Sequence, residues 1–260
     1  MTNDTDTQSP WWHRFFDLTY AEIGLTESDP ERVARTVEFL HRVLELGEGM
    51  RVFDQCCGVG RLSLPLARRG VQVTGVDQTA DYIEQADRSA RDEGLPAEFH
   101  CADAFEFVTG HPCDAAVNWF TSFGYDVRDE VNARMLRCAF DSVKPGGRFV
   151  VDYLNLPRVF RRFQHRTWHG ADPASTDGVI VAEEPVLNFA RGMIDSVWTF
   201  LHPDGRREQR SISIRMYLPH EIVGLLRGCG FEDVELFGSI EGEAFGLDTP
   251  RCIAVARKPS

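Results

Sequence analysis

The spacing of apolar residues changes several times along this chain between a helical and a strand-like period. Between residues 32 and 46 apolar positions recur every three or four residues, which predicts a helix. From residue 51 onward, short apolar runs alternate with helical segments. We expect strands at 51–54, 71–77, 97–101, 114–119 and 148–154, and helices at 62–69, 80–93, 130–143 and 158–163. Alternating strands and helices, with nearly continuous apolar strands, predict a parallel sheet covered on both faces.

The pattern becomes strand-like after about residue 170. Three segments at 178–189, 192–202 and 207–217 favour an antiparallel meander, with Pro203-Asp204-Gly205 as the turn between the last two. A helix at 219–229 begins at Pro219 and stops at Gly230. The last two predicted strands, 231–239 and 252–256, form a hairpin that completes the main sheet. The meander is therefore an insertion after the fifth strand.

These patterns divide the chain into four parts, residues 1–50, 51–170, 171–217 and 218–260. The first part carries a polar stretch at 1–10, expected to be disordered, and then the aromatic run WWHRFFDLTY at 11–20. We expect this run to act as a lid that closes on a filled cleft and excludes water. The second part is the ligand-binding core, the third is the β insertion, and the fourth is the C-terminal helix and hairpin.

The first chemical signal is a glycine-bearing turn after the first core strand, Asp54-Gln55-Cys56-Cys57-Gly58-Val59-Gly60. Turns of this kind let a ligand approach the backbone closely and present the N–H groups at a helix start to it. Alone, a Gly-x-Gly turn is equally well explained as a tight connection.

Polar side chains also end the next three strands. Asp77 lies nineteen residues beyond Gly58, the spacing at which an acidic side chain binds a pair of ribose hydroxyls. Asp103 follows the third strand, where a carboxylate suits the exocyclic amine of adenine. Asn118 ends the fourth strand and is followed by WFTSFGY. All of them fall at the carboxyl edge of the sheet, where open α/β sheets bind ligands.

The ordered series from the glycine turn through Asp77, Asp103 and Asn118 to Val143-Lys144-Pro145-Gly146-Gly147 resembles the class I S-adenosylmethionine-dependent methyltransferases. The resemblance covers residues 51–154 and implies their α/β fold, a Rossmann-like seven-stranded methyltransferase sheet with helices on both faces. More loosely, the whole chain is similar to bacterial small-molecule N-methyltransferases of antibiotic and amino-sugar pathways. The chain departs from the usual pattern at Cys56, which stands where glycine is usual; its side chain is expected to crowd the cofactor or to require a negative φ.

The resemblance implies that S-adenosylmethionine is the cofactor and assigns residues to it. Its amino-acid part would be held by the backbone at Cys56, Gly58 and Gly60, with Asp54 bracing the loop. Asp77 would bind the ribose hydroxyls and Gln78 would lie against the adenine edge. Asp103 and the Ala104 N–H would bind the adenine, and Asn118 would contact the cofactor near the sulfonium. The absence of a third glycine at Leu62 or Ser63 argues against a dinucleotide site.

Methyl transfer from a sulfonium requires alignment and exclusion of water more than proton transfer. An amine acceptor needs only to be neutral, whereas a hydroxyl usually needs a base or a metal. The eight histidines are scattered and no metal-ligand spacing is seen, so the prediction is an amine nitrogen and no metal. Trp12, Tyr20 and Phe120 are the candidate catalytic residues, as aromatic walls for a cationic acceptor.

The amino-acid composition limits the classes of molecule that this protein is expected to bind. Lys and Arg number 28 and Asp and Glu 40, giving a net charge of −12, so nucleic acid is not an expected partner. The polar N-terminus, the odd number of cysteines (seven) and the lack of a long apolar run favour a cytoplasmic protein without a membrane segment. The β insertion is a candidate surface for homo-oligomer formation. Three alternatives stay open: O- or C-methyl transfer, other chemistry with the same cofactor, and a non-catalytic cofactor-binding protein.

Overall fold

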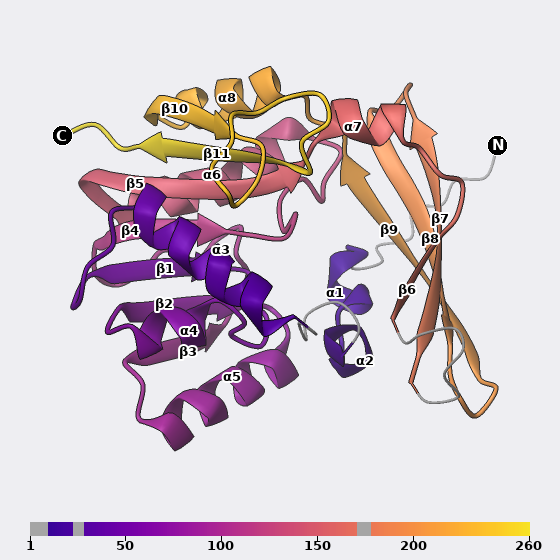
Figure 1. Ribbon diagram of the computed structural model, residues 1–260, viewed down its shortest axis with the longest axis horizontal. Helices are drawn as coiled ribbons and strands as arrows, with labels where there is room; N and C mark the ends of the chain where they lie inside the picture. Colours follow the sequence, from indigo (N-terminus) through magenta and orange to yellow (C-terminus); the bar gives the residue numbers. More distant parts are fainter. Residues whose placement is uncertain (1–9, 23–28, 171–177) are drawn as a thin grey trace.

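The computed structural model describes residues 10–22, 29–170 and 178–260. Seven strands form the main sheet in the order β10-β11-β5-β4-β1-β2-β3 (Figure 1). Their bounds are β1 Arg51–Gln55, β2 Gln72–Asp77, β3 Ala97–Cys101, β4 Cys113–Asn118, β5 Val143–Leu154, β10 Glu232–Phe237 and β11 Arg251–Arg257. Strands β1 to β5 pair in parallel, while β11 runs antiparallel to both β5 and β10. The predicted seven-stranded sheet and its terminal hairpin are confirmed.

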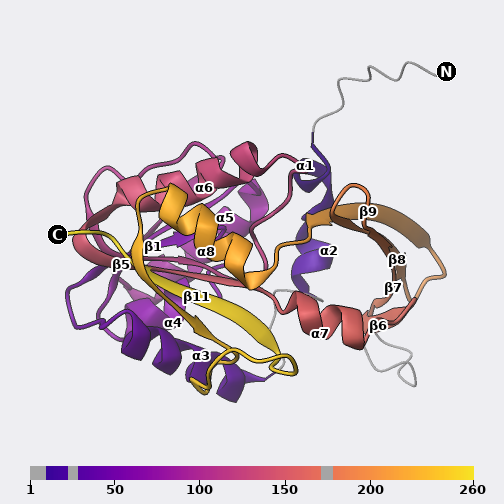
Figure 2. The same ribbon diagram turned by 90° about the horizontal axis from the view of Figure 1, so that it is seen from above.

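Five helices pack against this sheet: α3 Pro30–Val43, α4 Ser63–Arg68, α5 Ala80–Glu93, α6 Asp129–Ser142 and α8 Pro219–Gly228. Successive residues of the central strand face opposite sides. Val52 belongs to the apolar cluster that includes α3 and α4, and Phe53 to the cluster that includes α6 and α8. Figure 2 shows α3 and α4 on one side of the sheet and α6 on the other. Both side chains are fully buried, as expected of a parallel sheet covered on both faces.

The second sheet is antiparallel, in the order β6-β7-β8-β9, and it follows the short helix α7 Leu156–Arg161. Its strands are β6 Thr167–Gly170, β7 Ile180–Asn188, β8 Met193–Leu201 and β9 Arg207–Arg215. Two short N-terminal helices, α1 Trp12–Phe15 and α2 Leu18–Tyr20, lie between the two sheets (Figure 1). The aromatic run at 11–20 is thus placed at the carboxyl edge of the main sheet.

Three features differ from the sequence prediction. Strand β6 was not predicted, because four residues next to a polar stretch carry too little periodicity, and it lies in the range that was assigned to the core. Helices α1 and α2 are likewise too short for a helical pattern. Strand β5 begins at Val143 rather than Arg148, because Val143 already pairs with Cys113 before the register shifts. A Cβ on Gly147 would come within 2.6 Å of the Asp114 carbonyl oxygen, so glycine permits this close approach.

Residues 1–9, the greater part of the stretch expected to be disordered, lie outside the described residues. In the part of the chain that the structure describes, no helix combines the length and the apolar character needed to cross a membrane.

Candidate functional site

The turn after β1 is anchored to β2 by backbone and side-chain hydrogen bonds. The Cys57 N–H donates to the Val76 carbonyl at 2.9 Å, and the Gly58 N–H donates to Asp77 Oδ2 at 3.1 Å. Below the turn, Ser63 Oγ donates to Asp54 Oδ2 at 2.5 Å. Gly58 and Gly60 have φ of 56° and 81°, which glycine adopts without steric cost. Asp54 is therefore tied to the start of α4, on the far side of the glycine turn.

Cys56 corrects one expectation from the sequence. Its φ is 61°, so the cysteine does not require a negative φ but takes the left-handed conformation that glycine would have. This conformation costs a non-glycine residue roughly 1–2 kcal/mol. The turn therefore keeps its path, and the thiol lies 3.9 Å from the Ser122 carbonyl oxygen, at the wall of the neighbouring cavity.

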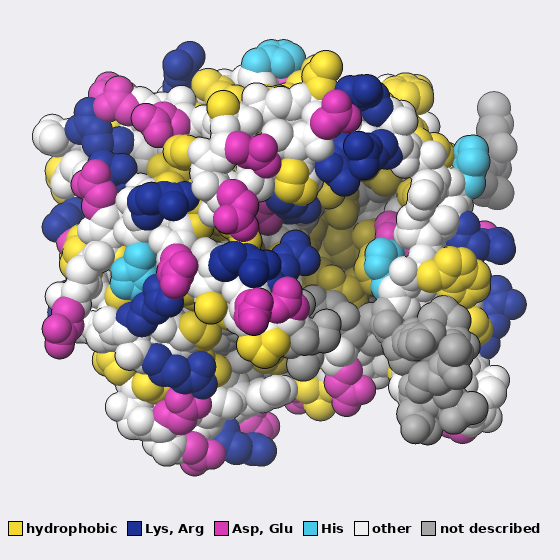
Figure 3. Space-filling view, viewed as in Figure 1, with side chains coloured by type: hydrophobic (Ala, Val, Ile, Leu, Met, Phe, Trp, Pro, Cys, Tyr) yellow, Lys and Arg dark blue, Asp and Glu magenta, His cyan; other side chains and the backbone are white. Residues whose placement is uncertain are grey.

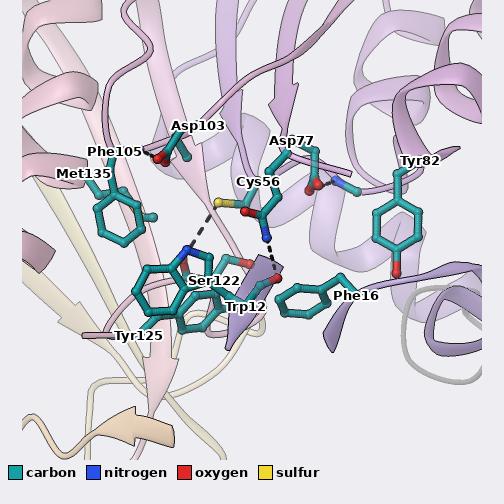
Figure 4. A pocket seen from close by; sticks show the side chains of 13 residues that line it. Trp12, Phe16, Cys56, Asp77, Tyr82, Asp103, Phe105, Ser122, Tyr125 and Met135 are labelled. Atoms are coloured by element: carbon teal, nitrogen blue, oxygen red, sulfur yellow. Dashed lines mark hydrogen bonds between the residues drawn. The ribbon is translucent and has the colours of Figure 1, made fainter. Parts of the chain in front are cut away.

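A narrow cavity lies at the carboxyl ends of β1, β2 and β3 (Figure 4); together with the solvent space at its mouth, its empty volume is about 520 Å³. On one side are Asp77, Cys56 and Asp103; on the other are Trp12, Phe16 and Tyr125, which come from the N-terminal segment and the loop after β4. Thirteen residues line it: Trp12, Phe16, Cys56, Gly58, Asp77, Gln78, Tyr82, Asp103, Ala104, Phe105, Ser122, Tyr125 and Met135. Carboxylates thus face aromatic rings across a narrow space.

This cavity is electrostatically negative. Burial raises the pKa of Asp77, although hydrogen bonds from the backbone N–H groups of Thr79 and Gly58 oppose that rise. The pKa of Asp54 is raised to about 7, chiefly by burial and also by the charge of Asp77, although the hydrogen bond from Ser63 opposes the rise. The pKa of the Cys56 thiol is raised well above its ordinary value by burial and by the charges of Asp77, Asp54 and Asp103. Such a site favours a cationic ligand and disfavours a pyrophosphate.

The structure brings six of the nine residues assigned to the cofactor onto this cavity, namely Cys56, Gly58, Asp77, Gln78, Asp103 and Ala104. Asp54 lines a smaller adjacent cavity on the other side of Cys56, together with Arg61 and Phe120. Gly60 lines neither cavity.

Asn118 and Gln78 have contacts that the sequence did not predict. Asn118 is fully buried and lines no cavity described above; its amide donates to Gln55 Oε1 at 3.1 Å, and it lies against Met135. Gln78 Nε2 donates to the Trp12 carbonyl at 2.6 Å. Gln78 thus ties the aromatic segment to the end of β2.

A second, larger cavity of about 1650 Å³, partly open to solvent, lies between the two sheets. Figure 3 shows it as a hollow lined by apolar side chains beside the second sheet. Phe16 and Tyr125 line both this cavity and the first one, and their rings stack with centroids 6.0 Å apart. Tyr20 and Phe120, predicted as acceptor walls, line the larger cavity, whereas Trp12 lines only the smaller one.

The loop that carries Phe120 is held in a strained conformation. Phe120 and Thr121 both have positive φ, 58° and 60°. Asp152, which is 2% exposed, accepts from the Phe120 N–H at 3.1 Å and receives two hydrogen bonds from Arg251 at 2.6 and 2.8 Å. Arg251 also donates to Thr121 Oγ1 at 2.6 Å. A buried ion pair therefore fixes the wall of the larger cavity.

Sequence reasoning missed several cavity residues, chiefly Phe16, Tyr82, Phe105, Ser122 and Met135. Phe16 lies in the aromatic run 11–20 and Ser122 in WFTSFGY, but neither was given a role in ligand binding, and no motif marks Tyr82, Phe105 or Met135. It also missed Glu183 of β7, which lines the larger cavity. Among the described residues, no group of three His, Cys, Asp or Glu side chains is placed to hold a metal ion.

Comparisons with known proteins identify a methyltransferase domain in this chain. A family model described as "Methyltransferase domain" matches residues 52–147. The S-adenosyl-L-methionine-dependent Diels-Alderase iccD of Talaromyces variabilis is 36% identical over 121 residues, which are 45% of this chain and 40% of that protein. The 23S rRNA (uracil(1939)-C(5))-methyltransferase RlmD of Stenotrophomonas maltophilia is 30% identical over 188 residues, 72% of this chain and 38% of the relative. The chain spans less than half the length of these relatives.

Solved structures resemble nearly the whole chain. The CcbJ methyltransferase from Streptomyces caelestis has a TM-score of 0.76 and 19% identity, over 89% of this chain and 91% of that one. CalS10, an amino pentose methyltransferase from Micromonospora echinaspora solved with S-adenosylmethionine bound, has a TM-score of 0.66 and 18% identity, over 90% and 93%. The chain therefore carries a methyltransferase domain at residues 52–147, within the fold of the class I S-adenosylmethionine-dependent methyltransferases.

Proposed function

We propose that this protein transfers a methyl group from S-adenosylmethionine to an amine nitrogen of a small-molecule acceptor. The observation that carries the proposal is the pair of adjoining cavities. One is narrow, aromatic and negatively charged. The other is large, with mostly apolar walls that also carry Glu183, Arg158 and Arg162, and Phe16 and Tyr125 line both cavities. Adjoining sites of this kind place a methyl donor and an acceptor next to each other, which is the main requirement of an in-line displacement.

The residues of the smaller cavity fit S-adenosylmethionine. The two oxygens of Asp77 lie at the end of β2, where they suit a ribose diol. Asp103 and the Ala104 backbone suit adenine, and Phe105 provides an apolar face beside them. The buried carboxylates suit the positive charges of the cofactor, whereas a dinucleotide pyrophosphate would meet them with like charge. When bound, this cofactor supplies a methyl group activated by a cationic sulfur.

The protein's own residues align the two reactants, exclude water from the site and stabilise the positive charge of the reacting groups. Trp12, which is 9% exposed, and Phe16 line the smaller cavity, where their rings would shield a bound cofactor from water. The ring of Phe120, braced from behind by Asp152, lies at the larger cavity, and the Arg61 guanidinium stacks on that ring at 3.9 Å. Aromatic faces on both sides of the shared wall suit a positive charge that passes from sulfur to nitrogen.

Nitrogen is favoured over oxygen for two reasons. An amine attacks without a strong base, and the aromatic larger cavity, with a net-acidic protein around it, suits a cationic acceptor. The amino pentose named for the structural neighbour CalS10 is an acceptor of this class. The net charge of −12 does not suit an RNA acceptor such as that of the relative RlmD.

The test is to incubate the protein with S-adenosylmethionine carrying a deuterated methyl group and a panel of primary and secondary amines. Product fragmentation then locates the label. We expect it on nitrogen, with kcat/KM rising with pH until the acceptor amine is neutral. A label on oxygen or carbon contradicts the nitrogen assignment, and the coarser proposal of methyl transfer then stands alone.

A second candidate is chemistry in which the cofactor keeps its methyl group. It is favoured by the similarity to the relative named a Diels-Alderase, which matches 45% of this chain. Turnover of an acceptor to an isomer, with no S-adenosylhomocysteine formed, would support it against methyl transfer.

A further inference from the structure

The larger cavity contains one acidic side chain among the described residues that line it, Glu183 of β7, and two basic ones, Arg158 and Arg162, which are both bonded to Asp248. The side chain is 20% exposed, and the walls around it are mostly aromatic or aliphatic, with Tyr20 and Trp198 among them. A carboxylate in such surroundings has given up much of its hydration, and this is unfavourable unless a partner compensates. The hydrogen-bond partners of the Glu183 carboxylate therefore show whether its charge is compensated.

Both hydrogen-bond partners of Glu183 among the described residues come from β6, the strand that pairs with β7. Thr167 Oγ1 donates to Glu183 Oε2 at 3.3 Å, and His169 Nε2 lies 2.9 Å from the same oxygen. The imidazole of His169 in turn stacks flat on the Trp198 ring, with centroids 5.2 Å apart and planes at 8°. These contacts fix the carboxylate's position but do not include the permanent cation that a buried carboxylate usually has.

The next residue along β7 provides the contrast. Glu184 pairs with the Arg166 guanidinium at 2.5 Å, and it does not line the larger cavity. Two adjacent glutamates on one strand thus point to opposite faces of the sheet. One of them faces an arginine, and the other faces the acceptor cavity. The charge of Glu183 also reaches the aromatic wall, because burial and this carboxylate together raise the pKa of Tyr20 to about 12.

We propose that Glu183 binds the cationic nitrogen of the acceptor and of the methylated product, and so selects amines over neutral or anionic compounds. This inference rests on the proposed function. In the reaction, the bound ammonium first gives up a proton to solvent. The freed nitrogen lone pair then forms the new N–C bond, the S–C electron pair stays on sulfur, and the positive charge passes to nitrogen. A fixed carboxylate beside that nitrogen opposes the developing charge. Tyr20 and Trp198 provide ring faces for the same cation.

The experiment is a calorimetric titration of the full chain, saturated with S-adenosylhomocysteine, with benzyltrimethylammonium. This probe has a permanent charge and cannot be methylated; neopentylbenzene is its uncharged isostere. We expect Glu183→Gln, whose amide oxygen can still accept from Thr167, to bind the cation about tenfold or more weakly than the wild type. Glu184→Gln, the matched control, should bind it as the wild type does. Neopentylbenzene should not distinguish the three proteins.

Equal affinity of the wild type and Glu183→Gln for benzyltrimethylammonium overturns the inference, as does a wild type that does not bind the cation. Retained S-adenosylhomocysteine binding by Glu183→Gln shows that the variant is folded. If the wild type does not bind S-adenosylhomocysteine, the proposed function is contradicted. In that case, the same titration with benzyltrimethylammonium in the absence of S-adenosylhomocysteine still shows whether Glu183 binds the cation.

Discussion

Three non-glycine residues at the site, Cys56, Phe120 and Thr121, hold left-handed backbone conformations. Each costs of order 1–3 kcal/mol and persists only where the surroundings enforce it. For Phe120 and Thr121 the enforcing groups are Asp152 and Arg251, which bond the backbone of one residue and the hydroxyl of the other. The ion pair therefore positions the wall of the acceptor cavity.

Replacing Arg251 with methionine should be strongly destabilising. It would leave the carboxylate of Asp152 buried without its cation, at a cost of about 3–5 kcal/mol in the free energy of unfolding. Arg257→Met, on the same strand, breaks an exposed ion pair with Asp233 and should cost about 1 kcal/mol or less. Urea unfolding of both variants measures the difference. Equal losses would show that the buried pair has no special role in holding the loop.

Asp54 should make stability depend on pH. Burial raises its pKa in the folded state to about 7, against an ordinary value of 3.8, so the folded chain holds this proton more tightly than the unfolded chain. The free energy of unfolding should therefore fall as the pH rises from about 4 to 7, and change little from this source above that range.

The check compares urea unfolding of the wild type and Asp54→Asn at pH 5 and pH 8. The variant keeps an acceptor for Ser63 but has no proton to lose, so its stability should decline less over this interval. Asp77, whose pKa is also raised, contributes the same trend to both proteins. Identical pH dependence in the two proteins would contradict the assignment to Asp54.

At the scale of elements, α1 is the piece that joins the two sheets. Its Trp12 belongs to the apolar cluster of the main sheet and its Phe15 to that of the second sheet. Gln78 holds the Trp12 carbonyl from one side. From the other side, Arg210 of β9 donates to the Phe15 carbonyl at 2.7 Å and to Asp17 Oδ2 at 2.6 Å. The segment predicted as a lid is thus hydrogen-bonded to residues of both sheets in the structure.

Arg210→Ala should loosen this segment on the side of the second sheet. We expect turnover to fall by about tenfold or more, because water reaches the methyl-transfer path, while the protein stays folded. Arg206→Ala, which removes an exposed pair with Asp204 from the nearby turn, is the control and should keep full turnover. Turnover and thermal melting of the two variants distinguish a loosened segment from an unfolded protein. A variant that melts far below the wild type would show that the segment is part of the core.

The sequence predicted long elements well and short ones poorly. Helix α5 and strand β3 have the predicted bounds, because apolar periodicity persists through each and Gly94 ends the helix. Strand β6 and helices α1 and α2 are three or four residues long, and their stability comes from tertiary contacts that periodicity does not record. Thr167 and His169, the partners of Glu183, lie on β6, and for that reason the environment of Glu183 could not be foreseen.

At the scale of the molecule, the two cavities differ in how far the sequence predicts them. The residues from Asp54 to Asp103 that we assign to the cofactor lie at successive strand ends of one parallel sheet, so their order along the chain implies that they meet in space. The larger cavity combines residues near positions 15, 120, 158, 183 and 212, which the fold alone brings together. Its aromatic members were foreseen in part, through the resemblance, and its carboxylate was not.

The central claim is that the cavity between Asp77 and Asp103 binds S-adenosylmethionine, and calorimetric titration of this cofactor into wild type and Asp77→Ala tests it most directly. We expect the wild type to bind S-adenosylmethionine and the variant to lose about 1.5–3 kcal/mol of binding free energy, the scale of hydrogen bonds to a charged group. Asp81→Asn, at an exposed position in the first turn of α5, should bind as the wild type does. Unchanged affinity in a folded Asp77→Ala protein would contradict the assignment of this site.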